Sequence, residues 1–148
     1  MPFEKAVVFK LNNEEFAIDI QQVERILGYI EPTKVPESPY FIKGIIKYQN
    51  NILPIMDLNA KFNKQNNDSI NSKIIVVKHN EKSIGLLVDD VQEVIDVKKD
   101  EIESTPEVIS QYSNKYINGI LKKENRIIMI IDTEKILTKE EFSSLSTL

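Results

Sequence analysis

The stretch FIKGIIKYQNNILPIMDLNAKF, residues 41–62, decides the fold, because a second copy of it follows in the same chain. The segment YINGILKKENRIIMIIDTEKIL, residues 116–137, aligns with it without a gap, 75 residues later. The positions that are identical in the two copies are, in the first, Ile42, Gly44, Ile45, Lys47, Asn50, Ile52, Ile55 and Asp57. Similarity over a segment of this length indicates a duplicated structural unit.

The duplication continues toward the N-terminus at a spacing of 68 residues. Phe9 there corresponds to Val77, and Val23 corresponds to Val91. The second half therefore carries an insertion of about seven residues. The acidic stretch from Asp89 to Glu107 can accommodate it, and we expect that stretch to be an exposed face or a loop.

Each copy contains short apolar runs that are typical of strands separated by turns. The predicted strands are 6–11, 16–20, 41–47, 52–56, 74–79, 84–88, 116–123 and 126–131, with a linker over 63–73. Pro54 predicts that its strand lies at a sheet edge or carries a bulge. The pattern predicts a mostly β protein of two small β-barrels, because closing a sheet removes its exposed edges.

The segment after the first hairpin carries the signals of a short amphipathic helix. Asp19 and Gln22 have the spacing of a helix-start box, and Gly28 is suited to the helix end. Ile20, Val23, Ile26 and Leu27 lie between these signals at helical spacing. We therefore predict a helix between Asp19 and Gly28.

Further short helices are expected where other capping residues occur. Asp57 and Asp132 stand at corresponding positions where a strand passes into a helix, so we interpret both as structural N-caps. Ser104, Glu107 and Pro106 predict a helix that runs to about residue 112. Residues 138–148 predict a C-terminal helix.

Composition narrows the classes of function. The 148 residues include no cysteine and one histidine, His79, so we predict no metal site, no cofactor and no catalytic residues. The net charge of −4 argues against nucleic acid as a partner. The sequence contains neither a long apolar run nor a signal peptide, so we expect a cytoplasmic protein that does not insert into the membrane.

Gly44 and Gly119 occupy matching positions within predicted strands. A glycine in the middle of a strand indicates a bulge or the close approach of another backbone. Either a bulge or a close backbone approach would have a structural role, and a close approach would also be compatible with a binding surface. The sequence leaves both readings open for this pair.

Five separated blocks of the chain resemble the CheW family. They are VVFKLNNEEFAIDIQQVERI, VPESPYFIKGII, ILPIMDLNAKF, IGLLVDDVQEVI and YINGI…RIIMIID, in this order, and they cover roughly residues 4–140. The resemblance implies one CheW-like domain over 1–148. Its fold would be two intertwined SH3-like five-stranded barrels, one from about 20–88 and one from about 1–19 plus 89–148.

The resemblance also implies a function. CheW proteins are non-catalytic scaffold adaptors that couple chemoreceptors to the histidine kinase CheA in bacterial chemotaxis, a two-component system. The implied partners are the regulatory domain of a CheA-type kinase and the cytoplasmic tip of a chemoreceptor. The implied location is the cytoplasm, at membrane-associated receptor arrays. A second hypothesis is a diverged CheW-like adaptor of another chemosensory pathway, such as surface motility.

Receptor contact is expected at the end of the first block and in the second block. Val23 and Gly44 match positions where the family places it, and Ile20, Ile26 and Lys43 complete the predicted receptor-binding residues. Ile20, Val23 and Ile26 would supply an apolar stripe, which could instead face the core.

The chain departs from the family pattern at two places. Gln49 and Asn50 replace the usual Arg-Gly pair, and Asn50 tolerates the positive φ that glycine would supply. Gln49 cannot form the bidentate ion pair of a guanidinium group. Arg25 stands where some members of the family carry an acidic residue. These changes bear on the choice of partner and leave the fold intact.

Overall fold

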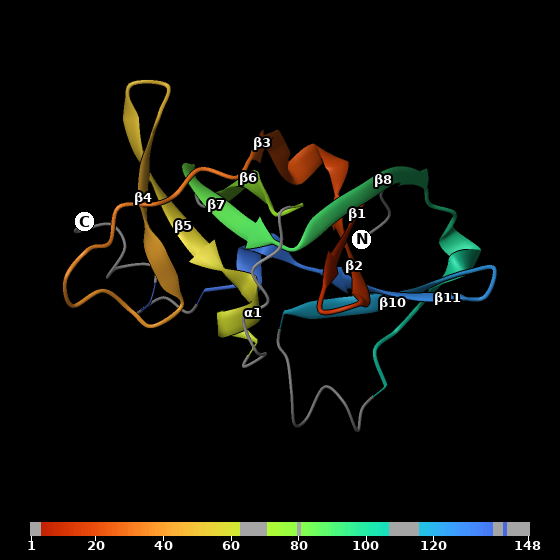
Figure 1. The fold of residues 1–148 in the computed structure, drawn as a ribbon. Coiled ribbons are helices and arrows are strands. Elements are labelled where there is room, and N and C mark those ends of the chain that lie inside the picture. Colours follow the sequence, from red (N-terminus) through yellow and green to blue (C-terminus); the bar gives the residue numbers. More distant parts are fainter. Residues whose placement is uncertain (1–3, 63–70, 80, 107–115, 138–140, 142–148) are drawn as a thin grey trace.

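The structure is a computed structural model that describes residues 4–62, 71–79, 81–106, 116–137 and 141. Two β-sheets lie side by side, with a few short helices between and around them (Figure 1). This arrangement confirms the predicted mostly β class.

Sheet A has six strands in the order β8-β1-β2-β11-β10-β9, and sheet B has five in the order β3-β6-β7-β5-β4. The strands are β1 (Lys5–Leu11), β2 (Glu14–Asp19), β3 (Val23–Gly28), β4 (Ile42–Tyr48), β5 (Asn51–Asp57), β6 (Lys73–His79), β7 (Lys82–Val88), β8 (Asp90–Asp96), β9 (Ile102–Glu103), β10 (Ile117–Lys123) and β11 (Arg126–Ile131). The helical turns are η1 (Ile20–Gln22), α1 (Leu58–Lys61), η2 (Lys99–Glu101) and η3 (Thr133–Lys135).

The order of the strands reflects the duplication, but each sheet combines strands from both halves of the chain. Strands β6, β7, β8, β10 and β11 of the second half correspond to β1, β2, β3, β4 and β5 of the first half. Sheet A takes its central hairpin β1–β2 from the first half and pairs it with β8 and β11 of the second. Sheet B takes hairpin β6–β7 from the second half and pairs it with β3 and β5 of the first. In each sheet the central hairpin thus comes from one half of the chain and the strands beside it come from the other half.

Buried side chains form three clusters that correspond to this arrangement. One cluster, which we call the shared core, joins the two sheets and includes Phe9 and Phe16 of sheet A and Met56 and Leu86 of sheet B. A second cluster fills sheet A and contains Ala6, Val8, Ala17, Ile95, Leu121, Ile128 and Ile130. A third fills sheet B and contains Ile46, Leu53, Ile55, Ile74, Val76 and Leu87. The sheets therefore share most of their large apolar side chains.

In both sheets, side chains or backbone groups connect segments that are not neighbours in the order of the strands. In sheet B the Tyr48 hydroxyl donates to Glu24 at 2.9 Å, which joins β4 to β3. Thr33, in the loop after β3, exchanges two backbone hydrogen bonds of 2.9 Å with Ile45 of β4. In sheet A, Arg126 of β11 lies 3.0 Å from Glu93 of β8.

The predicted helix between Asp19 and Gly28 is wrong. Asp19 does accept a hydrogen bond from the Gln21 N–H, at 3.0 Å, but only the three-residue turn η1 follows. The chain then continues as β3, in which Val23 pairs with Val77. β-Branched side chains are suited to a strand, and pairing with β6 satisfies the backbone groups that a helix would have satisfied internally.

Of the two alternatives predicted for the strand of Pro54, the sheet edge is wrong, because β5 lies between β4 and β7. The β4–β5 pair does carry a bulge, between Ile42 and Gly44 of β4. Pro54 is opposite Ile45, whose backbone N–H and C=O are both turned toward Thr33. The nitrogen of Pro54 consequently faces away from β4, and pairing with β7 begins only at Ile55. No ladder hydrogen bond of the β4 pair is lost at this proline.

Other expectations have mixed outcomes. Part of the acidic stretch, Asp90–Asp96, forms the edge strand β8, which is largely exposed, so of the two alternatives the exposed face is confirmed there and the loop is not. Sheet A has six strands, not five, because the two-residue β9 is added beside β10. Of the linker predicted over 63–73, residues 63–70 lie outside the described residues, and Lys73 already belongs to β6. Residues 104–106 at the start of the helix predicted after Ser104 are not helical, and its remainder and most of the C-terminal helix lie outside the described residues.

The short helical turns after β5 and β11 begin at the two aspartates that were expected there. The Asp57 carboxylate accepts hydrogen bonds from the N–H groups of Asn59, at 3.0 Å, and Ala60, at 3.4 Å. The Asp132 carboxylate accepts one from Glu134, at 3.0 Å. Asp57 is 6% exposed, and this burial raises the pKa of its carboxyl, while the backbone hydrogen bonds and Lys43 oppose the rise.

We predict that Asp57→Ala lowers the free energy of unfolding by about 0.5–2 kcal/mol, as the loss of an N-cap does. Asp57→Asn keeps the acceptor and removes the buried charge. Because the folded pKa is raised, ionisation of Asp57 costs stability once the pH exceeds the ordinary aspartate value of about 4. Relative to Asp57→Asn, the wild type should therefore lose stability between about pH 4 and pH 7 in urea unfolding. A pH-independent difference between the two would contradict this prediction.

Candidate functional site

The predicted binding residues lie at the two ends of β3 and on the neighbouring strand β4. Ile20 belongs to η1, just before β3, and is half-buried. Val23 is half-buried against the shared core. Ile26, near the other end of β3, is 40% exposed. The apolar stripe is therefore divided: Val23 contributes to the core, and Ile26 faces outward.

A bulge in β3 explains this division. The register against β6 shifts between Val23 and Arg25, which leaves Glu24 as the extra residue. Because a bulge displaces the alternation of side chains, Leu27 packs on the core of sheet B whereas Val23 packs on the shared core. Helical spacing alone would have placed these two side chains on one face.

Two further apolar residues, which the sequence analysis missed, extend the surface. Tyr29 is 40% exposed and Ile30 is 47% exposed, immediately after β3. The Tyr29 hydroxyl donates to Glu31 at 2.6 Å. Partial burial and this hydrogen bond raise the pKa of Tyr29. The signal in the sequence was an aromatic and a β-branched residue between Gly28 and residues 31–39, which contain three prolines. We call Ile20, Val23, Ile26, Tyr29 and Ile30 the β3 surface.

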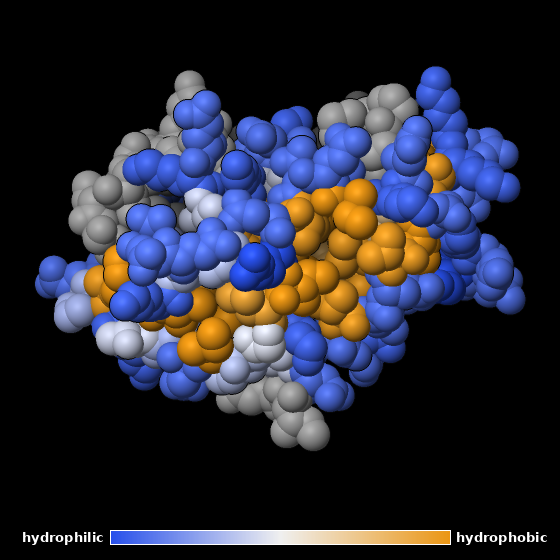
Figure 2. Space-filling model, turned by 90° about the horizontal axis from the view of Figure 1, so that it is seen from above, coloured by the Kyte–Doolittle hydropathy of each residue, from blue (hydrophilic) through white to orange (hydrophobic). Residues whose placement is uncertain are grey.

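The β3 surface belongs to a broader apolar face. Figure 2 views the molecule from above relative to Figure 1, and shows apolar residues gathered in a patch across the middle of this face. Val94 of β8, the counterpart of Ile26 in the duplication, is also exposed, at 51%. Exposed apolar residues that cluster on one face are typical of a protein–protein contact.

Lys43 is brought to the far end of this surface. Its ammonium group lies 5.5 Å from the centre of the Tyr29 ring, within the range of a cation–π contact. Lys43 is the extra residue of a bulge in β4, between Ile42 and Gly44. The structure thus brings Lys43 to Tyr29 at the end of β3, whereas Ile20 and Val23 lie at its beginning.

Gly44 is buried, and its environment is the chain's own loop. A Cβ built on Gly44 would lie 2.4 Å from the backbone oxygen of Thr33 and 2.9 Å from the Pro32 side chain. Its φ of +153° is rarely adopted by other residues. The close backbone approach predicted for Gly44 therefore occurs within this chain. Direct contact with a partner stays a prediction, and it would require Thr33 to move.

The turn that departs from the CheW pattern keeps its backbone geometry. Gln49 has φ +48° and Asn50 has φ +63°, the signs that a two-residue type I′ hairpin requires. The expectation that Asn50 tolerates a positive φ is confirmed. Arg25 lies on β3, close enough to affect Tyr48 electrostatically. Both departures are therefore found where β3 meets the β4–β5 hairpin.

Two other features, a metal site and a membrane-spanning helix, were searched for in the described part of the chain. There, no group of three or more His, Cys, Asp or Glu side chains is placed to hold a metal ion. Nor is any helix in the same part long and apolar enough to cross a membrane.

The class of protein is thus a mostly β domain of two sheets that share a core, in which each sheet combines strands of both halves of a duplicated chain. Residues 5–141 match the CheW-like domain family, so the chain belongs to that family.

Relatives and a solved structure agree with this assignment. The chain is 34% identical over 142 residues to the chemotaxis protein CheW of Bacillus subtilis, covering 95% of this chain and 91% of the relative. It is 33% identical over 138 residues to that of Klebsiella aerogenes, covering 93% and 83%. The crystal structure of the scaffolding protein TtCheW from Thermoanaerobacter tengcongensis superposes with a TM-score of 0.85 at 34% identity, covering 95% of this chain and 96% of that one.

Substitution of the paired glycines should distinguish a fold role from a contact role. We predict that Gly44→Ala lowers the free energy of unfolding by about 1–3 kcal/mol, because its Cβ would collide with Thr33. Gly119→Ala is the matched control: its φ of +110° also strains a side chain, but its Cβ would lie 3.3 Å from the nearest atom, so the added collision and the total cost should be smaller. Urea unfolding measures both. If Gly44→Ala kept full stability and lost only partner binding, Gly44 would be a contact residue.

Proposed function

We propose that this chain is a non-catalytic scaffold adaptor that couples chemoreceptors to a CheA-type histidine kinase in bacterial chemotaxis. The observation that carries the proposal is membership of the CheW-like domain family over residues 5–141. The names of its relatives, chemotaxis protein CheW, and of the superposable scaffolding protein support it. The adaptor would act in the cytoplasm, at membrane-associated receptor arrays.

We assign the receptor tip to the β3 surface and its neighbour Lys43. Ile26, Tyr29 and Ile30 expose apolar area that a partner can cover, and Lys43 adds a positive charge at one end. A helical segment that lays an apolar face on this surface would bury these side chains. The kinase regulatory domain would bind elsewhere on the same domain.

The two sheets would act together as one domain. We propose barrels from about 20–88 and from about 1–19 plus 89–148. The described strands of sheet B lie between Val23 and Val88, and those of sheet A lie between Lys5 and Asp19 and between Asp90 and Ile131, which supports this division.

Reconstitution tests the function. The chain is mixed with a CheA-type kinase and with membranes that carry chemoreceptors, and sedimentation and kinase autophosphorylation are measured. We expect the chain to sediment with both partners, and to stimulate the kinase only when receptors are present. Binding to the kinase and receptors of a different chemosensory pathway would favour the diverged adaptor. Binding to neither partner would overturn the proposal.

A charged substitution on the β3 surface tests the receptor assignment. We predict that Ile26→Asp weakens receptor binding at least tenfold, about 1.4 kcal/mol, because a carboxylate would be buried without a partner. Binding of the kinase and the melting temperature should change little. Ile127→Asp is the control, since Ile127 is 66% exposed and lies on sheet A. Equal loss of receptor binding in both variants would show that Ile26 is not specific to the contact.

A further inference from the structure

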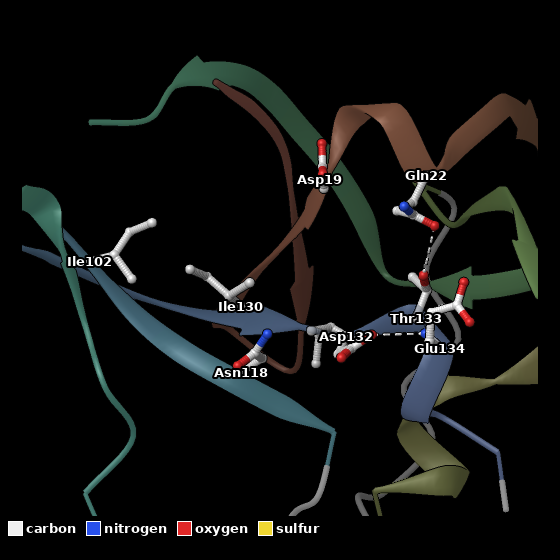
Figure 3. Close-up of a pocket in the computed structure, with 9 residues that line it drawn as sticks. Asp19, Gln22, Ile102, Asn118, Ile130, Asp132, Thr133 and Glu134 are labelled. Atoms are coloured by element: carbon white, nitrogen blue, oxygen red, sulfur yellow. Dashed lines mark hydrogen bonds between the residues drawn. The ribbon is translucent and has the colours of Figure 1, made fainter. Parts of the chain in front are cut away.

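The bulge in β10 contains the dipeptide Asn118–Gly119, the only place in the sequence where asparagine precedes glycine. The pairing of β10 with β11 shifts between Ile117 and Ile120, so neither residue of the dipeptide has a partner on β11. Asn118 is exposed and lines a pocket together with Asp132 (Figure 3). Within the described part of the chain, its side-chain amide makes no hydrogen bond. The amide is therefore open to reaction.

An asparagine that is followed by glycine has a characteristic reaction with its own main chain. The backbone nitrogen of Gly119 attacks the side-chain carbonyl carbon of Asn118, so that a new carbon–nitrogen bond forms and the bond from that carbon to the amide nitrogen breaks. Ammonia leaves with the proton of the backbone N–H, and a cyclic succinimide remains. Water then opens the ring at one of its carbonyls and yields aspartate or isoaspartate. Glycine favours the reaction because no Cβ shields its nitrogen.

The fold requires the glycine of this pair and does not require the asparagine. Gly119 has a φ of +110°, a conformation that residues with a side chain rarely adopt. The corresponding residue of the first half, Gly44, also has a positive φ. The residue that corresponds to Asn118 is Lys43, which occupies the equivalent bulge of β4. An amide is thus not needed at this position, and the reactive pair arises from the choice of asparagine.

One side chain restrains the nitrogen that would attack. The Gly119 N–H donates a hydrogen bond to the Thr105 hydroxyl at 3.0 Å. The same hydroxyl donates to the backbone oxygen of Ile117 at 3.5 Å, so it holds the main chain on both sides of Asn118. The Gly119 nitrogen must give up its hydrogen bond before it can react with the Asn118 side chain.

The restraint comes from a small element of the sheet. Thr105 closely follows β9, a strand of two residues at the edge of sheet A. The first half holds the corresponding segment by two backbone hydrogen bonds between Thr33 and Ile45. At Gly119 the restraint is a single side-chain hydroxyl. Local opening of β9 would release it, because short edge elements open at a lower free-energy cost than the core.

We propose that Asn118 is a site of spontaneous deamidation and that the Thr105 hydroxyl controls its rate in the folded chain. The reaction converts a neutral side chain into a carboxylate near Asp132. Isoaspartate also lengthens the main chain of β10 by one methylene group, which weakens the pairing of that strand. The inference does not depend on the proposed function.

Peptide mapping of the aged protein tests the site. The purified chain is incubated at neutral pH, and mass spectrometry follows the exchange of the amide for a carboxyl group, while an isoaspartate methyltransferase identifies isoaspartate. We expect Asn118 to convert several-fold faster than Asn125, which is also exposed but precedes Arg126. The chain unfolded in guanidinium chloride should convert Asn118 faster still. Conversion of Asn118 no faster than that of Asn125 in the folded chain overturns the proposal.

Substitutions at Thr105 test the restraint. Thr105→Val keeps the shape of the side chain and removes the hydroxyl, so it should speed the conversion of Asn118 several-fold. Thr105→Ser keeps the hydroxyl and should react at the rate of the wild type. Asn125 is the internal control, since a general loosening of the β10–β11 hairpin would speed both sites. An equal increase at both asparagines, or no increase at Asn118, overturns the role of Thr105.

The stability of the two products tests the effect on β10. Asn118→Asp reproduces the aspartate form, and chromatography separates the isoaspartate form from the aged protein. The isoaspartate form should unfold at a lower urea concentration, because the longer main chain disturbs the register beyond the bulge. Asn118→Lys restores the residue of the first half and should neither deamidate nor lose stability. Equal urea midpoints for the two products would contradict the proposed weakening of β10.

Discussion

The pairing of each central hairpin with strands of the opposite half is the interaction on which the rest of this structure depends. Hairpin β1–β2 is flanked by β8 and β11, and hairpin β6–β7 is flanked by β3 and β5. Neither half can complete a sheet by itself, because the centre of each sheet comes from the other half. The two sheets must therefore form together, and the shared core that joins Phe9 to Met56 follows from this exchange.

Polar contacts then hold the two sheets in one relative position. Asp89 accepts hydrogen bonds from the Asn12 backbone at 2.7 Å and from the Asn59 amide at 2.9 Å, which links the β1–β2 turn to α1. Lys61 is almost fully buried, and it lies 2.7 Å from Glu141 and 4.4 Å from the centre of the Phe41 ring. A buried charge needs such partners, so these residues specify how the sheets meet. The relative position of the sheets in turn fixes where the β3 surface and the pocket beside Asp132 lie.

The duplication also shows where the two halves have diverged. The cap carboxylates Asp57 and Asp132 are retained because each begins a helical turn after a strand. Around them the halves differ, since Lys43 in one half corresponds to Asn118 in the other. One half consequently carries a lysine beside Tyr29, and in the other half the corresponding asparagine lines a pocket together with Asp132.

The hairpins, the internal duplication and the capping aspartates could be read from the sequence by itself, because alternation, turn residues and N-caps are local signals. The expectation that the two halves intertwine came from the resemblance to CheW. Tertiary structure decided the segment after Asp19, where the spacing of Ile20, Val23 and Ile26 is compatible with a helix and only pairing with β6 makes it a strand. It likewise decided that Gly44 faces Thr33, that Tyr29 joins Lys43, and that a pocket lies beside Asp132. These features depend on residues distant in sequence, which no local pattern encodes.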